Sequence, residues 1–240
     1  MKLSVGSMRW GMHLSVLAGL IVLLSLGTWQ VKRLAWKESL LASIEMRMAS
    51  PPLPLSEIEN RFQKTGDVDY YPVALSGSLV PGAEQYFLST YQGQSGWNIY
   101  APLRLGDGRF VMLNRGFVPY DRRDPATRPE SQVAVEKQFN GLARNPLAGK
   151  PSSMTPDNDV DDRTWFWKDL QGMAAAARID KEKLLPFFVD DWSDVPPDSL
   201  PITKTTLVLL PNNHLQYVVT WYGLAAALLG VWAVFTFPRR

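Results

Sequence analysis

The chain has 240 residues and a formal net charge of +2 at pH 7, so it suits one domain with appendages and gives no case for binding nucleic acid or an acidic substrate. Cysteine is absent, which excludes disulfides, iron–sulfur clusters, thiolate zinc sites and paired-thiol copper sites. Only two histidines occur, His13 and His214, which argues against a site built from clustered imidazoles.

The first predicted element is a transmembrane helix over residues 11–31. This run carries no formal charge, is mostly aliphatic, and at about 1.5 Å per residue is long enough to cross the roughly 30 Å hydrocarbon core. Trp10 and Trp29 bracket it, at the depth where indoles prefer to lie. A cleaved signal peptide is the alternative, because Lys2 and Arg9 precede the run and small residues lie near its end.

The helix is predicted to continue as a stalk over residues 32–48, because this segment is rich in good helix formers and a proline tract ends it. At helical spacing Trp29, Arg33 and Trp36 share one face, where a guanidinium can stack on indoles at the membrane boundary. This face is either an aromatic and basic membrane anchor or a surface that binds a partner.

Short β-type runs separated by glycine and proline follow, which predicts a β-rich, barrel-like domain with minor helices. The predicted strands cover residues 72–79, 85–90, 97–103, 110–113, 117–119, 133–142, 187–189 and 206–210. A short helix is expected over residues 171–179. With the stalk, this extramembrane domain occupies residues 32–213.

Two segments of the domain stand out. Asn114, Arg115 and Gly116 lie between two β-type runs, where Gly116 suits a bulge or a turn with positive φ and Arg115 can pair with a buried carboxylate. The second segment, residues 165–167, is a run of three aromatic side chains. It suits core packing or, if exposed, a platform for a haem-like or lipid-like ligand.

A second transmembrane helix is predicted over residues 214–237, since this stretch is uncharged and two arginines follow it. An asparagine can cap its start. His214 then lies in the first turn, where the positive end of the helix favours a neutral imidazole with a free lone pair, as a haem iron or a transition metal requires. Tyr217 and Trp221 share its face and can flank a macrocycle. An interfacial polar anchor is the alternative.

The arginines beyond the second span favour cytoplasmic tails at residues 1–10 and 238–240, with the central domain on the far side of the membrane. Basic residues on both sides of the first span leave the local charge rule about balanced there. No leader rich in arginine and serine precedes that span, so we expect the inner membrane of a bacterium and a periplasmic domain.

Enzymatic motifs do not stand out. The sequence holds no phosphate-binding loop and no G-x-S-x-G elbow, and its two histidines are predicted on opposite faces of the membrane. Its carboxylates form no recognisable acid–base pair. We therefore expect no catalytic residue and no enzymatic activity.

Four segments, in order along the chain, resemble motifs of the Surfeit locus protein 1 family of cytochrome c oxidase assembly factors. They contain Trp29-Gln30 with Arg33, Trp36 and Lys37; Asn114-Arg115-Gly116 with Val118-Pro119; Trp167 with Asp169; and Pro211-Asn212 with His214, Tyr217 and Thr220-Trp221-Tyr222-Gly223-Leu224. Val218 departs from the commoner family pattern, which has alanine at that position.

The resemblance implies a non-enzymatic, chaperone-like factor of the respiratory chain that helps deliver haem a to, or insert it into, subunit I of haem–copper oxidase. It makes His214 the candidate ligand of the haem iron, with Tyr217 and Trp221 as further haem contacts. It also implies partner-binding residues for subunit I and for the haem a synthesis machinery, namely Trp29, Gln30, Arg33, Trp36, Asn114, Arg115 and Gly116.

Other hypotheses stay open. One is a cofactor-free membrane scaffold that binds oxidase subunits, and another is a membrane-tethered enzyme of unknown chemistry. A copper chaperone is a poor fit, because the chain lacks cysteine. The predicted topology also sets His13 and His214 about a bilayer apart, so the two cannot ligate the same haem.

Overall fold

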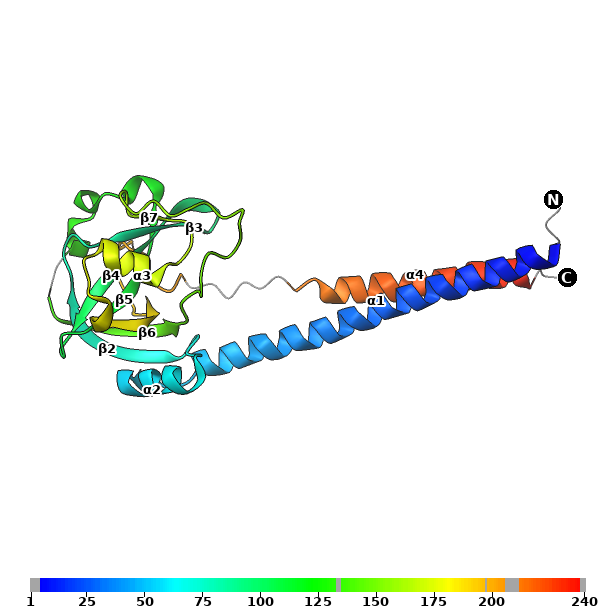
Figure 1. Cartoon of the computed structure of the whole chain (residues 1–240), viewed down its shortest axis with the longest axis horizontal. Helices are drawn as coiled ribbons and strands as arrows, with labels where there is room; N and C mark the ends of the chain where they lie inside the picture. The colour runs from blue at the N-terminus through cyan, green and yellow to red at the C-terminus, as the bar shows by residue number, and fades with distance from the viewer. Residues whose placement is uncertain (1–4, 133–134, 197, 206–211, 238–240) are drawn as a thin grey trace. The chain divides into compact units, whose positions relative to one another are not determined.

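The structure, a computed structural model, describes residues 5–132, 135–196, 198–205 and 212–237 (Figure 1). The chain divides into two compact units. The helical unit comprises residues 1–43 and 208–240, and the domain comprises residues 44–207.

Helix α1 (Val5–Met48) and helix α4 (His214–Thr236) each contain an apolar stretch long enough to cross a membrane. The 44 residues of α1 form one unbroken helix, since no proline occurs in them. The helices predicted over residues 11–31 and 32–48 are thus confirmed as one continuous element. The second predicted span is confirmed as a helix of 23 residues.

Within the helical unit, α1 and α4 approach closely where α1 has glycine. A Cβ atom added to Gly27 would lie 2.9 Å from the ring of Tyr222, and one added to Gly19 would lie 3.1 Å from Leu228. The hydroxyls of Thr28 and Tyr222 are 3.2 Å apart across the same contact. Small residues and interhelical hydrogen bonds are the usual means by which membrane helices associate, because lipid gives them no hydrophobic driving force.

The domain is built on one sheet with the order β1-β2-β6-β8-β5-β4-β3-β7. An additional pairing of β2 with β4 closes β2, β6, β8, β5 and β4 into a five-stranded barrel, which confirms the β-rich, barrel-like prediction. The strands are β1 (Leu53–Pro54), β2 (Pro72–Leu79), β3 (Gln85–Tyr91), β4 (Gln94–Leu105), β5 (Phe110–Pro119), β6 (Lys137–Arg144), β7 (Thr164–Trp165) and β8 (Leu184–Asp191).

Most strand predictions agree with these bounds, with informative exceptions. The strands expected over residues 110–113 and 117–119 are one strand, β5, because a β-bulge opposite residues 98–100 carries the chain through Gly116 without ending the ladder. The strand expected from residue 133 begins at Lys137 in the described chain. The strand predicted over residues 206–210 lies outside the described residues.

Two helices accompany the barrel. Helix α3 (Leu170–Ala176) matches the short helix expected over residues 171–179. Helix α2 (Leu55–Thr65) was not predicted, since it is short and follows the proline tract directly. It buries Ile58 in the barrel core, packs Phe62 against Phe187 with tilted rings whose centroids are 5.8 Å apart, and ends at Gly66 with φ +68°.

Candidate functional site

His214 occupies the first position of α4, as predicted. Asn213 is the residue at the N-cap, but its side chain makes no capping hydrogen bond, so the capping prediction is wrong. The physical reason is its backbone, with φ −92° and ψ 7°, which departs from the extended conformation that lets a cap side chain reach back to the first turn.

The imidazole of His214 is held instead by helix α1. Its Nδ1 lies 2.7 Å from Oε1 of Gln30. Gln30 is buried, with only 8% of its surface exposed. An amide oxygen accepts hydrogen bonds and cannot donate them, so Nδ1 carries the proton in this contact. The lone pair of the neutral ring then lies on Nε2, the nitrogen that can bind a metal.

Two aromatic side chains follow His214 on the same face of α4. Tyr217 is half exposed, and Trp221 is partly buried. The indole N–H of Trp221 is buried and has no hydrogen-bond partner within the described part of the chain. The site therefore offers one imidazole lone pair, one unused N–H donor and an aromatic surface, a set that suits a flat aromatic ligand with an iron centre and polar substituents.

The other histidine, His13, has the opposite arrangement. The indole Nε1 of Trp232 donates to its Nδ1 over 2.9 Å, so in the neutral ring the proton lies on Nε2. Trp232 lies near the far end of α4, about 27 Å from His214 along the helix axis at about 1.5 Å per residue. The two histidines thus lie near opposite ends of the helix pair and cannot share one ligand.

The predicted aromatic and basic face lies on α1. The guanidinium of Arg33 stacks over the ring of Trp36 at 3.9 Å from the centroid, which confirms that part of the prediction. Trp29 and Trp36 are 56% and 50% exposed, respectively. Partner binding by this face stays a prediction. Gln30 differs from its neighbours, because its side chain is buried and contacts α4.

Asn114 and Gly116 have internal structural contacts in the domain. The amide Nδ2 of Asn114 donates to Asp190 over 2.9 Å, and its Oδ1 accepts from the backbone N–H of Gly116. Gly116 has φ +114°, and a Cβ there would lie 2.0 Å from the carbonyl oxygen of Ile202. The positive φ predicted for Gly116 is confirmed, and any other residue would be strained at this position. Partner binding by these residues stays a prediction.

Arg115 pairs with a buried carboxylate, as expected. Its guanidinium donates to Oε1 of Glu84 over 2.9 Å and to the carbonyl of Ser131. Glu84 also accepts hydrogen bonds from both terminal nitrogens of Arg128, whose side chain is fully buried. Burial by itself would raise the pKa of the Glu84 carboxyl, but the hydrogen bonds and positive charge of Arg128, with smaller contributions from Gln132 and Arg115, hold it below its usual value.

Sequence reasoning missed Glu84 and Arg128, because neither belongs to a recognisable motif. The expectation that Arg115 needs a buried carboxylate pointed to such a group without identifying it.

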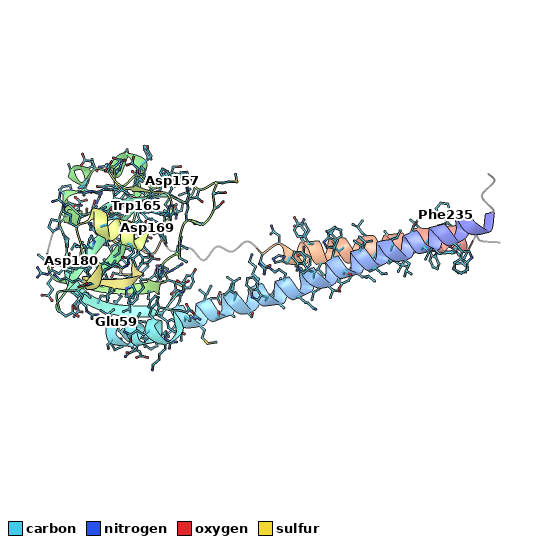
Figure 2. The ribbon with its side chains drawn as sticks, viewed as in Figure 1. Glu59, Asp157, Trp165, Asp169, Asp180 and Phe235 are labelled. Atoms are coloured by element: carbon cyan, nitrogen blue, oxygen red, sulfur yellow. The ribbon has the colours of Figure 1, made fainter. Side chains whose placement is uncertain are left out.

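The aromatic run of residues 165–167 contributes to the domain core. Trp165 is fully buried and donates from its indole to Oε1 of Gln85 over 2.9 Å. Asp169 caps α3 by accepting from the N–H of Gly172. Figure 2 shows both side chains within the domain. Trp165 therefore serves core packing. Its ring has no exposed surface on which a ligand could lie.

The model of the SURF1 family matches residues 17–226. Similar relatives include Surfeit locus protein 1 of Gallus gallus, 31% identical over 94% of this chain and 74% of the relative, and that of Xenopus tropicalis, 35% identical over 87% and 70%. A SURF1-like protein of the bacterium Rickettsia felis is 25% identical over 93% of this chain and 96% of the relative.

The chain belongs to the SURF1 family. Membership implies a role in the assembly of cytochrome c oxidase. The two apolar helices and the similarity to a bacterial SURF1-like protein support a membrane location. The span matched by the SURF1 model includes Gln30 and His214 and begins after His13.

Proposed function

We propose that this SURF1 family protein is a non-enzymatic assembly factor that assists delivery of haem a to subunit I of cytochrome c oxidase, with His214 as the ligand of the haem iron. The observation that carries the proposal is the 2.7 Å contact between His214 and Gln30, in which Nδ1 donates its N–H to the amide oxygen and the lone pair of the neutral ring lies on Nε2.

The residues around this nitrogen fit a haem. Iron in haem proteins takes a neutral imidazole nitrogen as an axial ligand. Tyr217 and Trp221 supply aromatic surface on the same helix face, and the unused indole N–H of Trp221 can donate to a polar substituent of the macrocycle. When bound, haem a supplies the redox-active iron that the oxidase requires.

Each residue has a defined part in holding and releasing the haem. His214 would hold the iron through Nε2 while Nδ1 keeps its proton and donates its N–H to Oε1 of Gln30, so binding would need no proton transfer at the ring. The chain has no cysteine, and its other histidine lies near the far end of the helix pair. Of the two imidazoles of the chain, His214 alone would be placed to hold this haem, and one such ligand would favour transfer to an acceptor over permanent retention.

The topology proposed with this function places both chain ends in the cytoplasm and the domain in the periplasm of a bacterial cell. It is supported by the arginines that follow α4 and by the apolar stretches of α1 and α4. His214, at the start of α4, then lies near the outer surface of the membrane, where a lipophilic haem can pass between membrane proteins.

A second candidate function is a cofactor-free scaffold for oxidase subunits. The exposed Arg33–Trp36 stack favours it, because a cation held on an indole at the membrane boundary is a suitable surface for a partner protein. In this alternative His214 anchors α4 to α1 and binds no iron.

The test is to purify the full chain from cells that make haem a and to record its absorption spectrum. We expect a haem spectrum for the wild type and for His13→Ala, and its loss in His214→Ala. The parallel measurement is oxidase activity in a strain that lacks the gene. A haem-free wild-type protein, or intact oxidase assembly in the deletion strain, would contradict the proposal. Full oxidase activity with His214→Ala would favour the scaffold.

A further inference from the structure

The contact between Gln30 and His214 carries one further inference, which rests on the proposed function. We propose that Gln30 is a positioning residue for the haem ligand. By accepting the N–H of His214 Nδ1, it fixes the ring in the tautomer and orientation in which Nε2 binds the iron.

Burial and exposure along α1 support a dedicated role for Gln30. The residues on either side, Trp29 and Val31, are 56% and 42% exposed, whereas Gln30 is 8% exposed. A primary amide buried within an apolar helix pair costs free energy unless its polar atoms are hydrogen-bonded. The 2.7 Å bond to His214, a residue on the other helix, supplies that partner.

The second histidine of the chain, His13, shows how the neighbour of the ring sets the position of its proton. At His13 the neighbour is Trp232, whose indole N–H can only donate, and the ring receives that bond on Nδ1. The neutral ring of His13 therefore carries its proton on Nε2 and has no lone pair there. Because both rings use Nδ1 toward the other helix, the donor or acceptor type of the neighbour decides which histidine is ready to bind a metal through Nε2.

The hydrogen-bond partner of a ligating histidine also tunes binding. Loss of such a partner typically costs about 10–100-fold in metal affinity. A stronger acceptor makes the imidazole a more basic ligand, which stabilises the ferric over the ferrous state. The acceptor at position 30 should therefore control both the affinity for haem and the reduction potential of the bound iron.

Three variants separate this role from a structural one. Gln30→Met keeps the length of the side chain and removes the acceptor. Gln30→Glu keeps an acceptor at the same position. Gln216→Met is the matched control, since Gln216 is an exposed glutamine on α4 within one turn of His214.

The first measurement uses the full chain without haem, in lipid nanodiscs, with ¹⁵N-labelled histidine. The nitrogen shifts should show His214 protonated on Nδ1 and His13 protonated on Nε2. In Gln30→Met the His214 signals should move toward a mixture of tautomers, while the His13 signals stay unchanged. His214 protonated on Nε2 in the wild type, or unchanged His214 signals in Gln30→Met, would overturn the inference.

The second measurement is a haemin titration of the same samples. Gln30→Met should bind about 10–100-fold more weakly than the wild type. Gln30→Glu should retain binding and show a more negative reduction potential, and Gln216→Met should match the wild type. Equal affinity for Gln30→Met and the wild type would also overturn the inference. A wild-type chain that binds no haemin contradicts the proposed function instead, and the nitrogen shifts still decide the role of Gln30.

Discussion

The polar motif residues of the helical unit and of the domain differ in how many of their side-chain polar atoms are hydrogen-bonded within the protein. In the domain, Asn114 and Arg115 direct their side-chain polar groups to partners within the fold. In the helical unit, the bond to Gln30 uses one nitrogen of His214 and leaves the other with its lone pair. A motif residue whose polar atoms are satisfied internally supports the fold, whereas one that keeps an atom available is a candidate for ligand binding.

The domain should therefore respond to substitution through stability, and the helical unit through haem binding. The sharpest test in the domain is Glu84→Gln, which removes the negative charge between the buried Arg128 and the partly buried Arg115. We expect the free energy of unfolding to fall by roughly 3–5 kcal/mol, because uncompensated buried charges are costly. Chemical unfolding of the full chain measures it, with the exposed Glu57→Gln as control. A change as small as that of the control would contradict the structural role.

The same carboxylate predicts a dependence on pH. The pKa of Glu84 in the folded protein is lower than its ordinary value of 4.5, so the carboxylate stabilises the fold above that pH. This contribution is lost as the pH falls below 4.5 through the folded-state pKa. Acid unfolding should show that loss for the wild type and a smaller one for Glu84→Gln. Parallel acid-unfolding curves for the two proteins would show that Glu84 is not the group concerned.

Gly116→Ala tests the bulge of β5. The positive φ by itself costs about 1–3 kcal/mol for a residue with a side chain, and the carbonyl of Ile202 would lie 2.0 Å from the new Cβ. We expect a lower unfolding temperature with unchanged haem affinity per folded molecule. Gly149→Ala is a suitable control, since a Cβ there meets nothing within 4 Å. If Gly116→Ala lost haem at unchanged stability, the domain residues would not act through stability alone.

His214→Ala tests the other side of the comparison. Loss of the proposed ligand should weaken haem binding at least about 100-fold, equivalent to about 2.7 kcal/mol. The unfolding of the domain should not change, because His214 belongs to the helical unit. Haem titration and chemical unfolding of the same sample measure the two quantities. His13→Ala, the matched variant, should retain wild-type affinity.

The smallest expected effect belongs to the Arg33–Trp36 stack. Arg33→Gln removes a cation–π contact worth about 0.5–1 kcal/mol and should leave haem affinity unchanged. If this face binds an oxidase subunit, co-purification of that subunit should weaken, and Lys32→Gln, on a neighbouring exposed residue, is the control. Equal co-purification with both variants would leave membrane anchoring as the role of the stack.

Several features followed from local sequence alone. Uncharged apolar runs without proline determine α4 and residues 11–31 of α1, and good helix formers continue α1 to Met48, because helix geometry and hydropathy need no distant partner. Alternating short apolar runs punctuated by glycine and proline determined the β-rich domain, and the isolated Gly116 indicated a bulge.

Other features depended on contacts between residues far apart in the chain. The pairing of β2 with β4 closes the barrel, Glu84 supplies the carboxylate for Arg115, and α2 is stabilised by burying Ile58 in the barrel core. The sequence placed an imidazole at the start of α4, but the position of its proton is set by Gln30 on the other helix. Hydrogen-bond partners across the fold decide a tautomer, and no pattern of neighbouring residues encodes them.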